Sequence, residues 1–144
     1  MVSWGSVAKF PSAMSLVTSV LDGAFGFWSL PDAHRARYLD RLYGGLVMLL
    51  SRFTDDWHAA RIDRSRVFVV PFPRLMGDFD HLMADALAFV DHPVDDALAA
   101  TLAARAEKQR AYESPHTYDL ARFGLEEARI LANTARFRET FLDD

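Results

Sequence analysis

The stretch Val67 to Val70 is the only segment of this chain with the composition of a β-strand. Pro71 and Pro73 end the run, and the sequence offers no second run for it to pair with. A strand without a partner leaves its backbone hydrogen-bonding groups unsatisfied. The sequence therefore predicts an all-α fold in which residues 66–73 form an extended, proline-flanked crossover. Pairing of this strand across a dimer is the alternative.

Apolar residues recur at helical spacing in five longer segments, which predicts a compact bundle of five main helices. The second of these follows Ser29, Pro31 and Asp32, which together form a helix start. A sixth, short helix is expected after the cap at Thr54. The expected helices span residues 11–28, 31–53, 54–62 (the short one), 73–91, 93–112 and 117–141.

The last predicted helix, residues 117–141, is the longest and carries apolar residues on two faces. Such a helix must be covered on both sides. We expect it either to form the centre of the bundle or to be half buried in a homodimer. In the dimer, Leu125, Leu131 and Phe137 would contact the partner chain.

The chain has 144 residues, which predicts one helical domain over residues 1–144. Half of the residues are hydrophobic and 25% are charged, as in ordinary soluble globular proteins. The absence of cysteine excludes a disulfide framework, a zinc ribbon and a thiolate nucleophile. These values predict a soluble protein that needs no cofactor.

The formal net charge of -4 disfavours duplex DNA as the main partner, because that affinity comes from neutralised phosphates. Arginines outnumber lysines 14 to 2, a bias that indicates a bacterium with a GC-rich genome. The most apolar segment, residues 42–50, is too short to span a membrane. Residues 1–27 do not have the pattern of a secretion signal. A cytoplasmic location is therefore expected.

An arginine and a histidine lie on either side of one short connection, at Arg110 and His116, with Tyr118 two residues further on. Side chains at these positions can converge on one pocket. A histidine can move the proton of a ribose hydroxyl, while an arginine holds the phosphate as charge builds on it. This combination suits cleavage of a phosphodiester bond without a metal ion.

The spacing resembles the R-x4-6-H-x-Y motif of HEPN domains, small all-helical ribonucleases found as toxins or in antiviral systems. The resemblance covers nine residues and the fold class. It implies that Arg110 and His116 are catalytic and that Tyr118 matches the tyrosine that partner antitoxins modify. The alternative is a structural connector in which Ser114 caps the last helix and Arg110 meets the carbonyl groups of its own helix.

Two histidines stand near acidic residues, but neither group has the spacing of a metal site. His81 and Asp85 are four residues apart on one helical face, which predicts a surface pair. Asp95 and Asp96, near His92, are typical first-turn acids. Because no Glu-x-x-His or His-x-x-x-His pattern occurs, we predict no metal site.

These observations leave three functional hypotheses. The leading one is a small soluble helical module for protein interaction or binding that forms homodimers. The alternative is a HEPN-like ribonuclease that acts on RNA through Arg110 and His116. The third is a helical bundle that binds a small molecule.

Overall fold

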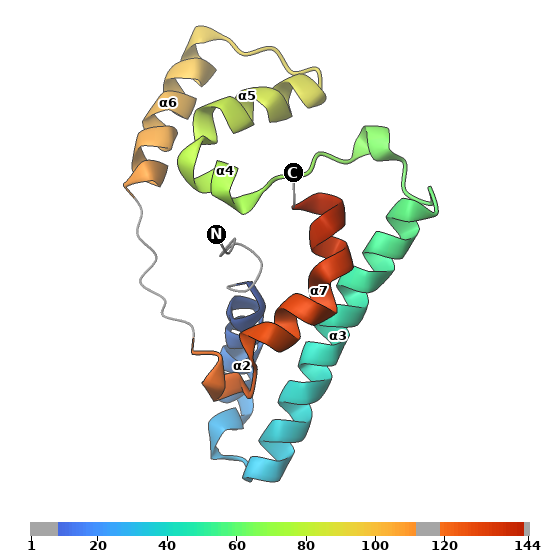
Figure 1. The fold of residues 1–144 in the computed structure, drawn as a ribbon. Coiled ribbons are helices and arrows are strands. Elements are labelled where there is room, and N and C mark those ends of the chain that lie inside the picture. Colours follow the sequence, from blue (N-terminus) through green and yellow to red (C-terminus); the bar gives the residue numbers. More distant parts are fainter. Residues whose placement is uncertain (1–8, 112–118, 143–144) are drawn as a thin grey trace. The chain divides into compact units, whose positions relative to one another are not determined.

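A computed structural model describes residues 9–111 and 119–142. Within these two ranges the fold is all-α, as predicted, with six α-helices, three short 3-10 helices and no strand. The α-helices are α2 (Lys9–Phe25), α3 (Asp32–His58), α4 (Phe72–Gly77), α5 (Phe79–Phe89), α6 (Asp96–Arg110) and α7 (Glu127–Phe141) (Figure 1). The 3-10 helices are η1 (Phe27–Ser29), η2 (Arg64–Arg66) and η3 (Ala121–Phe123).

Contacts divide the chain into two compact units, residues 1–62 with 117–144 and residues 63–116. We call them unit 1 and unit 2. Unit 1 contains α2, α3 and α7, and unit 2 contains α4, α5 and α6. The assignment of residues 1–144 to one domain stays a prediction.

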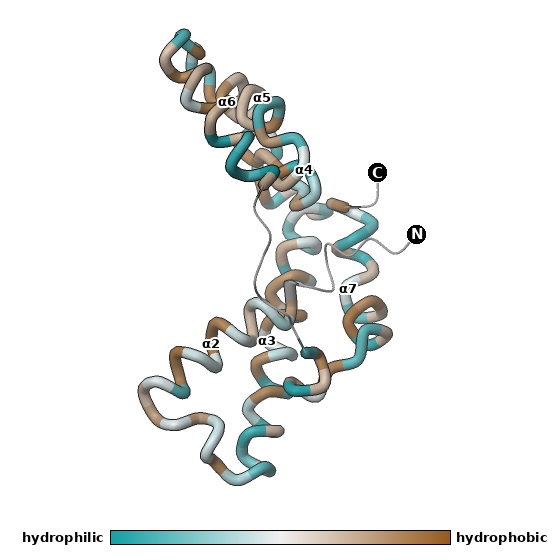
Figure 2. Tube along the Cα trace, turned by 90° about the vertical axis from the view of Figure 1, so that its left-hand side faces the viewer, coloured by the Kyte–Doolittle hydropathy of each residue, from teal (hydrophilic) through white to brown (hydrophobic). Residues whose placement is uncertain are grey.

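The core of unit 1 lies where α2, α3, η3 and the start of α7 meet. Hydrophobic residues, brown in Figure 2, recur along these elements. Burial of one large apolar side chain contributes about 1.5–3 kcal/mol, so a core of this size is the main source of stability. The buried members are Phe10, Met14, Phe27, Leu39, Tyr43, Phe123, Leu125 and Ile130.

Helices α3 and α7 lie side by side and run in the same direction (Figure 1). Near their starts Arg129 pairs with Asp40 at 2.9 Å, and near their ends Thr140 lies 3.0 Å from the imidazole of His58. Each helix also buries one threonine, whose hydroxyl donates to a carbonyl of its own helix. The buried hydroxyls therefore need no partner from the opposite helix.

Helix α3 is longer than predicted because it does not stop at Thr54. The predicted cap at Thr54 is wrong: this side chain is buried, and its hydroxyl donates at 2.8 Å to the carbonyl of Leu50 inside a continuous helix. The next residue, Asp55, pairs with Arg136 of α7 and does not cap a new helix. Residues 54–58 consequently belong to α3, which is the longest helix described.

The last helix is shorter than predicted and begins at Glu127, ten residues later than expected. Gly124 adopts a left-handed conformation with φ at 65°, which ends η3 and turns the chain. Leu125 thus stands before α7 and belongs to the core of unit 1, with 5% of its surface exposed. A sequence pattern cannot show this turn, since glycine also occurs inside helices of this chain.

In unit 2 the predicted helix over residues 73–91 is split in two at Asp78, whose backbone φ is -136°. The resulting α4, α5 and α6 pack together around Leu82 and Ala106, both fully buried. The rings of Phe68 and Phe89 lie 5.4 Å apart. Residues 67–71 form neither helix nor strand, and their first and last residues are extended.

Candidate functional site

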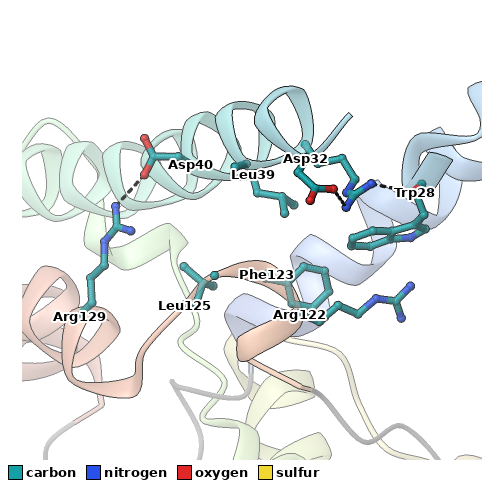
Figure 3. A pocket seen from close by; sticks show the side chains of 11 residues that line it. Trp28, Asp32, Leu39, Asp40, Arg122, Phe123, Leu125 and Arg129 are labelled. Carbon is teal, nitrogen blue, oxygen red and sulfur yellow. Dashed lines mark hydrogen bonds and ion pairs between the residues drawn. The ribbon is translucent and has the colours of Figure 1, made fainter. Parts of the chain in front are cut away.

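A pocket of about 460 Å³ opens on the surface of unit 1 (Figure 3). It lies between η1, the first turns of α3, η3 and the first turn of α7. Leu39, Phe123 and Leu125 form its apolar floor, and all three belong to the core. Because the floor is part of the core, the shape of the pocket is set by the fold.

Trp28 forms one wall of the pocket. Its backbone N–H donates at 3.0 Å to the carboxylate of Asp22, which fixes the start of η1. Its ring lies 5.1 Å from the ring of Phe27 and 6.2 Å from that of Phe123. The guanidinium of Arg122 lies over the indole, 4.2 Å from the ring centre. This cation–π contact places a positive charge at the edge of an apolar pocket.

Arg35 is held by the chain that leads into α3. It donates to the carbonyl oxygen of Trp28 at 2.9 Å and to that of Leu30 at 2.5 Å, and it also pairs with Asp32. Because Arg35 already has three acceptors, its role is structural. It fixes the Trp28 wall relative to α3 and is not the cation available to a ligand.

Arg129 closes the opposite end of the pocket (Figure 3). It pairs with Asp40 at 2.9 Å, and its guanidinium lies 4.5 Å from the ring centre of Tyr43. The hydrogen bond to the Asp40 carboxylate raises the pKa of Arg129 above its usual value. This end of the pocket is polar but locally neutral.

The charges around the pocket leave one cation uncompensated. Arg35 and Arg129 are each matched by an aspartate, whereas Arg122 forms no ion pair with any residue that the structure describes. A guanidinium beside an aromatic wall is suited to bind an anion, because charge-assisted hydrogen bonds are stronger than neutral ones. The pocket therefore combines an apolar floor with one available positive charge.

Arg110, the described member of the predicted ribonuclease motif, lies in the last turn of α6 and is exposed. Its guanidinium is 3.8 Å from the carboxylate of Asp80 in α5. His116 and Tyr118 lie outside the described residues, so whether the motif converges stays a prediction. Arg110 belongs to unit 2, and none of the residues that line the pocket do.

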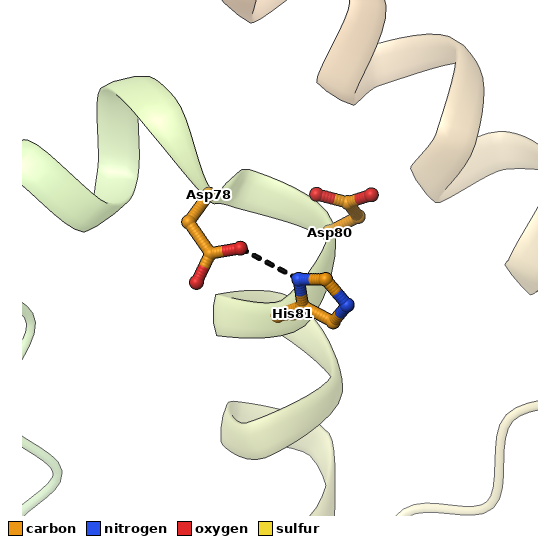
Figure 4. Close-up of side chains that lie close together, drawn as sticks. All are labelled: Asp78, Asp80 and His81. Carbon is orange, nitrogen blue, oxygen red and sulfur yellow. Dashed lines mark hydrogen bonds and ion pairs between the residues drawn. The ribbon is translucent and has the colours of Figure 1, made fainter.

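His81 pairs with a different aspartate from the one predicted. Its Nδ1 lies 2.6 Å from Asp78 (Figure 4), while Asp85 accepts a hydrogen bond from Arg74 at 2.8 Å. The hydrogen bond with Asp78 raises the pKa of His81 and lowers the pKa of Asp78. The helix break at Asp78 explains the change of partner, because it moves this residue to the start of α5.

Asp80 completes a cluster with Asp78 and His81 in which the ligand-type atoms lie within 4.8 Å of one another (Figure 4). The cluster is largely exposed, and within the described ranges no fourth ligand joins it. Its members are accounted for by ion pairs of unit 2, with His81 on Asp78 and Arg110 near Asp80. We therefore do not assign it a function.

The pocket could not be read from the sequence because its residues come from three separate segments. Trp28 and Arg122 are 94 positions apart, and no motif links them. The only local signal was the helix start at residues 29–32, which correctly places Asp32 in the first turn of α3.

No helix among residues 9–111 and 119–142 combines the length and the apolar character that crossing a membrane requires. Comparison with protein-family models, with curated proteins and with solved structures finds no match to this chain.

Proposed function

We propose that this protein is a binding module for a small amphipathic monoanion, a carboxylate attached to a flat apolar body. The observation that carries the proposal is the guanidinium of Arg122, which lies over Trp28 beside an apolar floor and pairs with no carboxylate among the described residues. Of the three hypotheses from the sequence, these features favour the helical bundle that binds a small molecule.

The size of the pocket fits this class of ligand. Pockets that hold small molecules typically measure about 300–1,000 Å³, with a mostly apolar lining and a few placed polar groups. The pocket of unit 1, at about 460 Å³, is in the lower part of that range. An apolar body would cover Leu39, Phe123 and Leu125, and the carboxylate would reach Arg122.

The charge balance favours a single negative charge. Asp32 and Asp40 stand at the two ends of the pocket and would repel a ligand with several charges. Arg35 and Arg129 already have carboxylate partners, so a second anionic group would have to displace one of them. A polyphosphate or a nucleic acid strand fits this arrangement less well than a carboxylate does.

A matched pair of probes tests the proposal. The probes are 2-naphthoate and its neutral alcohol, 2-naphthylmethanol, titrated into the ¹⁵N-labelled full chain and followed by amide chemical shifts. We expect 2-naphthoate to bind more tightly, with shifts centred on η1, η3 and the start of α3. Arg122→Ala should weaken 2-naphthoate by about tenfold to a hundredfold, the scale of one charge-assisted hydrogen bond.

Arg37→Ala provides the matched control, because Arg37 is an exposed arginine of α3 outside the pocket. It should leave the affinity unchanged. Equal affinity for the acid and the alcohol would contradict the proposal. So would shifts that lie away from the pocket, or the absence of binding at millimolar probe.

The ribonuclease alternative stays a prediction that a separate assay decides. It requires the purified protein to cut single-stranded RNA in the presence of a chelator, because neither proposed role needs a metal. His116→Ala should abolish the cleavage, and Arg110→Ala should lower its rate by about a hundredfold or more. Intact RNA in the wild-type assay would end this alternative.

A further inference from the structure

The outer face of α3 carries apolar side chains that no other described part of unit 1 covers. Met48 and Leu49 are 68% and 65% exposed. Gly44 and Gly45 precede them on the same side of the helix, and Arg41 and Arg52 bound the face at its two ends. An exposed apolar patch of this kind, bounded by charged residues, marks an interaction surface.

The two glycines indicate how closely a partner approaches. A Cβ added at Gly44 or Gly45 meets nothing within 4 Å, so packing inside the chain does not require glycine there. Glycine in the middle of a helix lowers its stability relative to alanine. Small residues let two helix axes come close. A helix of another chain that crosses at this point would therefore explain the two glycines.

The charges on this face exclude a simple pairing of α3 with α3. Arg41 and Arg52 are 11 residues apart, which places them on one side of the helix and about 17 Å apart along it. Neither forms an ion pair with another described residue. In a symmetric contact of two α3 faces, arginine would oppose arginine. The partner surface must instead place a carboxylate opposite at least one of these arginines.

Helix α7 offers such a carboxylate beside small side chains. Glu139 is exposed and has no ion-pair partner in the part of the chain that the structure describes. Residues three and four apart share one side of a helix, so Glu139 lies on the same side as a row of small side chains. The row consists of Ala128, Ala132 and Ala135.

We propose that two copies of this chain form a symmetric dimer in which α7 of one copy packs on the outer face of α3 of the other. Within one copy α3 and α7 are parallel, so a two-fold axis perpendicular to them makes α3 antiparallel to α7 of the second copy. Arg41 then lies level with Glu139 of the second copy, at one end of the alanine row. Each contact occurs twice, and Met48 covers the alanine row.

The last helix takes part in this dimer through side chains other than those that the sequence predicts. Leu125 lies in the core, Leu131 packs against that core, and the ring of Phe137 lies 5.0 Å from Phe141 of its own chain. These three side chains, which the sequence suggests as dimer contacts, are used within unit 1. The alanine row is the side of α7 that is left for a second copy.

A charge exchange tests this arrangement. The full chain is examined by light scattering and sedimentation at 1–200 µM, and we expect a dimer. Arg41→Glu and Glu139→Arg should each weaken dimerisation by about tenfold or more, because each places like charges together twice. The double variant should restore it. Met48→Asp should also weaken the dimer, because it puts a charge into the apolar contact.

Arg105→Glu, an equal charge change at an exposed arginine of α6, is the control and should leave the dimer intact. Helical circular dichroism verifies that every variant is folded. A wild-type protein that is monomeric at all concentrations overturns the proposal. A dimer that persists in Arg41→Glu and Met48→Asp, or that the double variant does not restore, overturns it as well.

Discussion

Asn133 of α7 donates a hydrogen bond of 2.9 Å to the phenol oxygen of Tyr43, a side chain of α3 that is only 1% exposed. The same phenol lies 3.3 Å from the carbonyl oxygen of Arg129, and the Tyr43 ring carries the guanidinium of that arginine. Tyr43, a core residue, thus determines the position of Arg129 at one end of the pocket. Changes at Tyr43 should therefore affect stability and ligand binding together.

Tyr43→Phe should lower the free energy of unfolding by about 1 kcal/mol, because it removes the shared hydrogen bonds and keeps the ring. Asn133→Ala should cost a similar amount, and the double variant should cost less than the sum of the two. Urea unfolding measures all three. Tyr38→Phe, at a more exposed tyrosine, is the control; an equal effect at Tyr38 would contradict the role of the Tyr43 network.

Substitution of alanine for glycine should change the free energy of unfolding in opposite directions at two positions. Gly124 has φ at 65°, so Gly124→Ala should cost about 1–2 kcal/mol. Gly23 lies in α2, and a Cβ there meets nothing within 4 Å, so Gly23→Ala should add up to about 1 kcal/mol. Thermal and urea unfolding report both changes. Stabilisation by Gly124→Ala would refute the left-handed turn before α7.

Leu125→Ala should destabilise the folded monomer by about 2–5 kcal/mol, because it leaves a cavity in the core of unit 1. The loss should be the same at high and low protein concentration. If Leu125 instead lay at a dimer contact, as the sequence suggests, the loss would depend on concentration. Unfolding at 2 µM and at 100 µM separates the two positions.

The pair of His81 and Asp78 should make stability depend on pH. Because the pKa of His81 is raised in the folded protein, its contribution is complete below about 6.5 and is lost as the pH rises through the folded pKa. Because the pKa of Asp78 is lowered, its contribution is present above about 3.8 and is lost as the pH falls through the folded value. The pair stabilises the protein most between these limits.

His81→Ala should therefore lower the melting temperature more at pH 5 than at pH 8. The effect should be small, because both side chains are largely exposed to solvent. His34→Ala changes an exposed histidine of α3 and serves as the control. A difference between His81→Ala and the wild type that stays constant from pH 5 to pH 8 would contradict the pairing with Asp78.

The sequence predicts the fold class correctly because helical spacing is a local property that each segment carries by itself. It fails at helix ends where tertiary contacts decide. Thr54 has the chemistry of a cap, yet its side chain is buried and its hydroxyl donates to the carbonyl of Leu50 inside α3. Gly124 ends a helical pattern that the side chains alone would continue, and this shifts Leu125 from an expected interface into the core.

The candidate site was harder to predict than the fold, because it depends on residues that meet only after folding. Arg122 is one of 14 arginines in the chain, and its neighbours in the sequence do not distinguish it from the others. What singles it out is its position over Trp28, where no described carboxylate pairs with it. A motif such as that of Arg110 and His116 is visible in a sequence for the opposite reason, since its members are neighbours along the chain.

The hydrogen bonds of Arg35 to the carbonyl groups of Trp28 and Leu30 have a kinetic consequence for binding. They hold the indole wall in position before any ligand arrives, so little conformational freedom remains to be lost on complex formation. Ligands of similar charge should then enter at similar rates. Discrimination among them should appear in their residence times, which surface plasmon resonance measures directly.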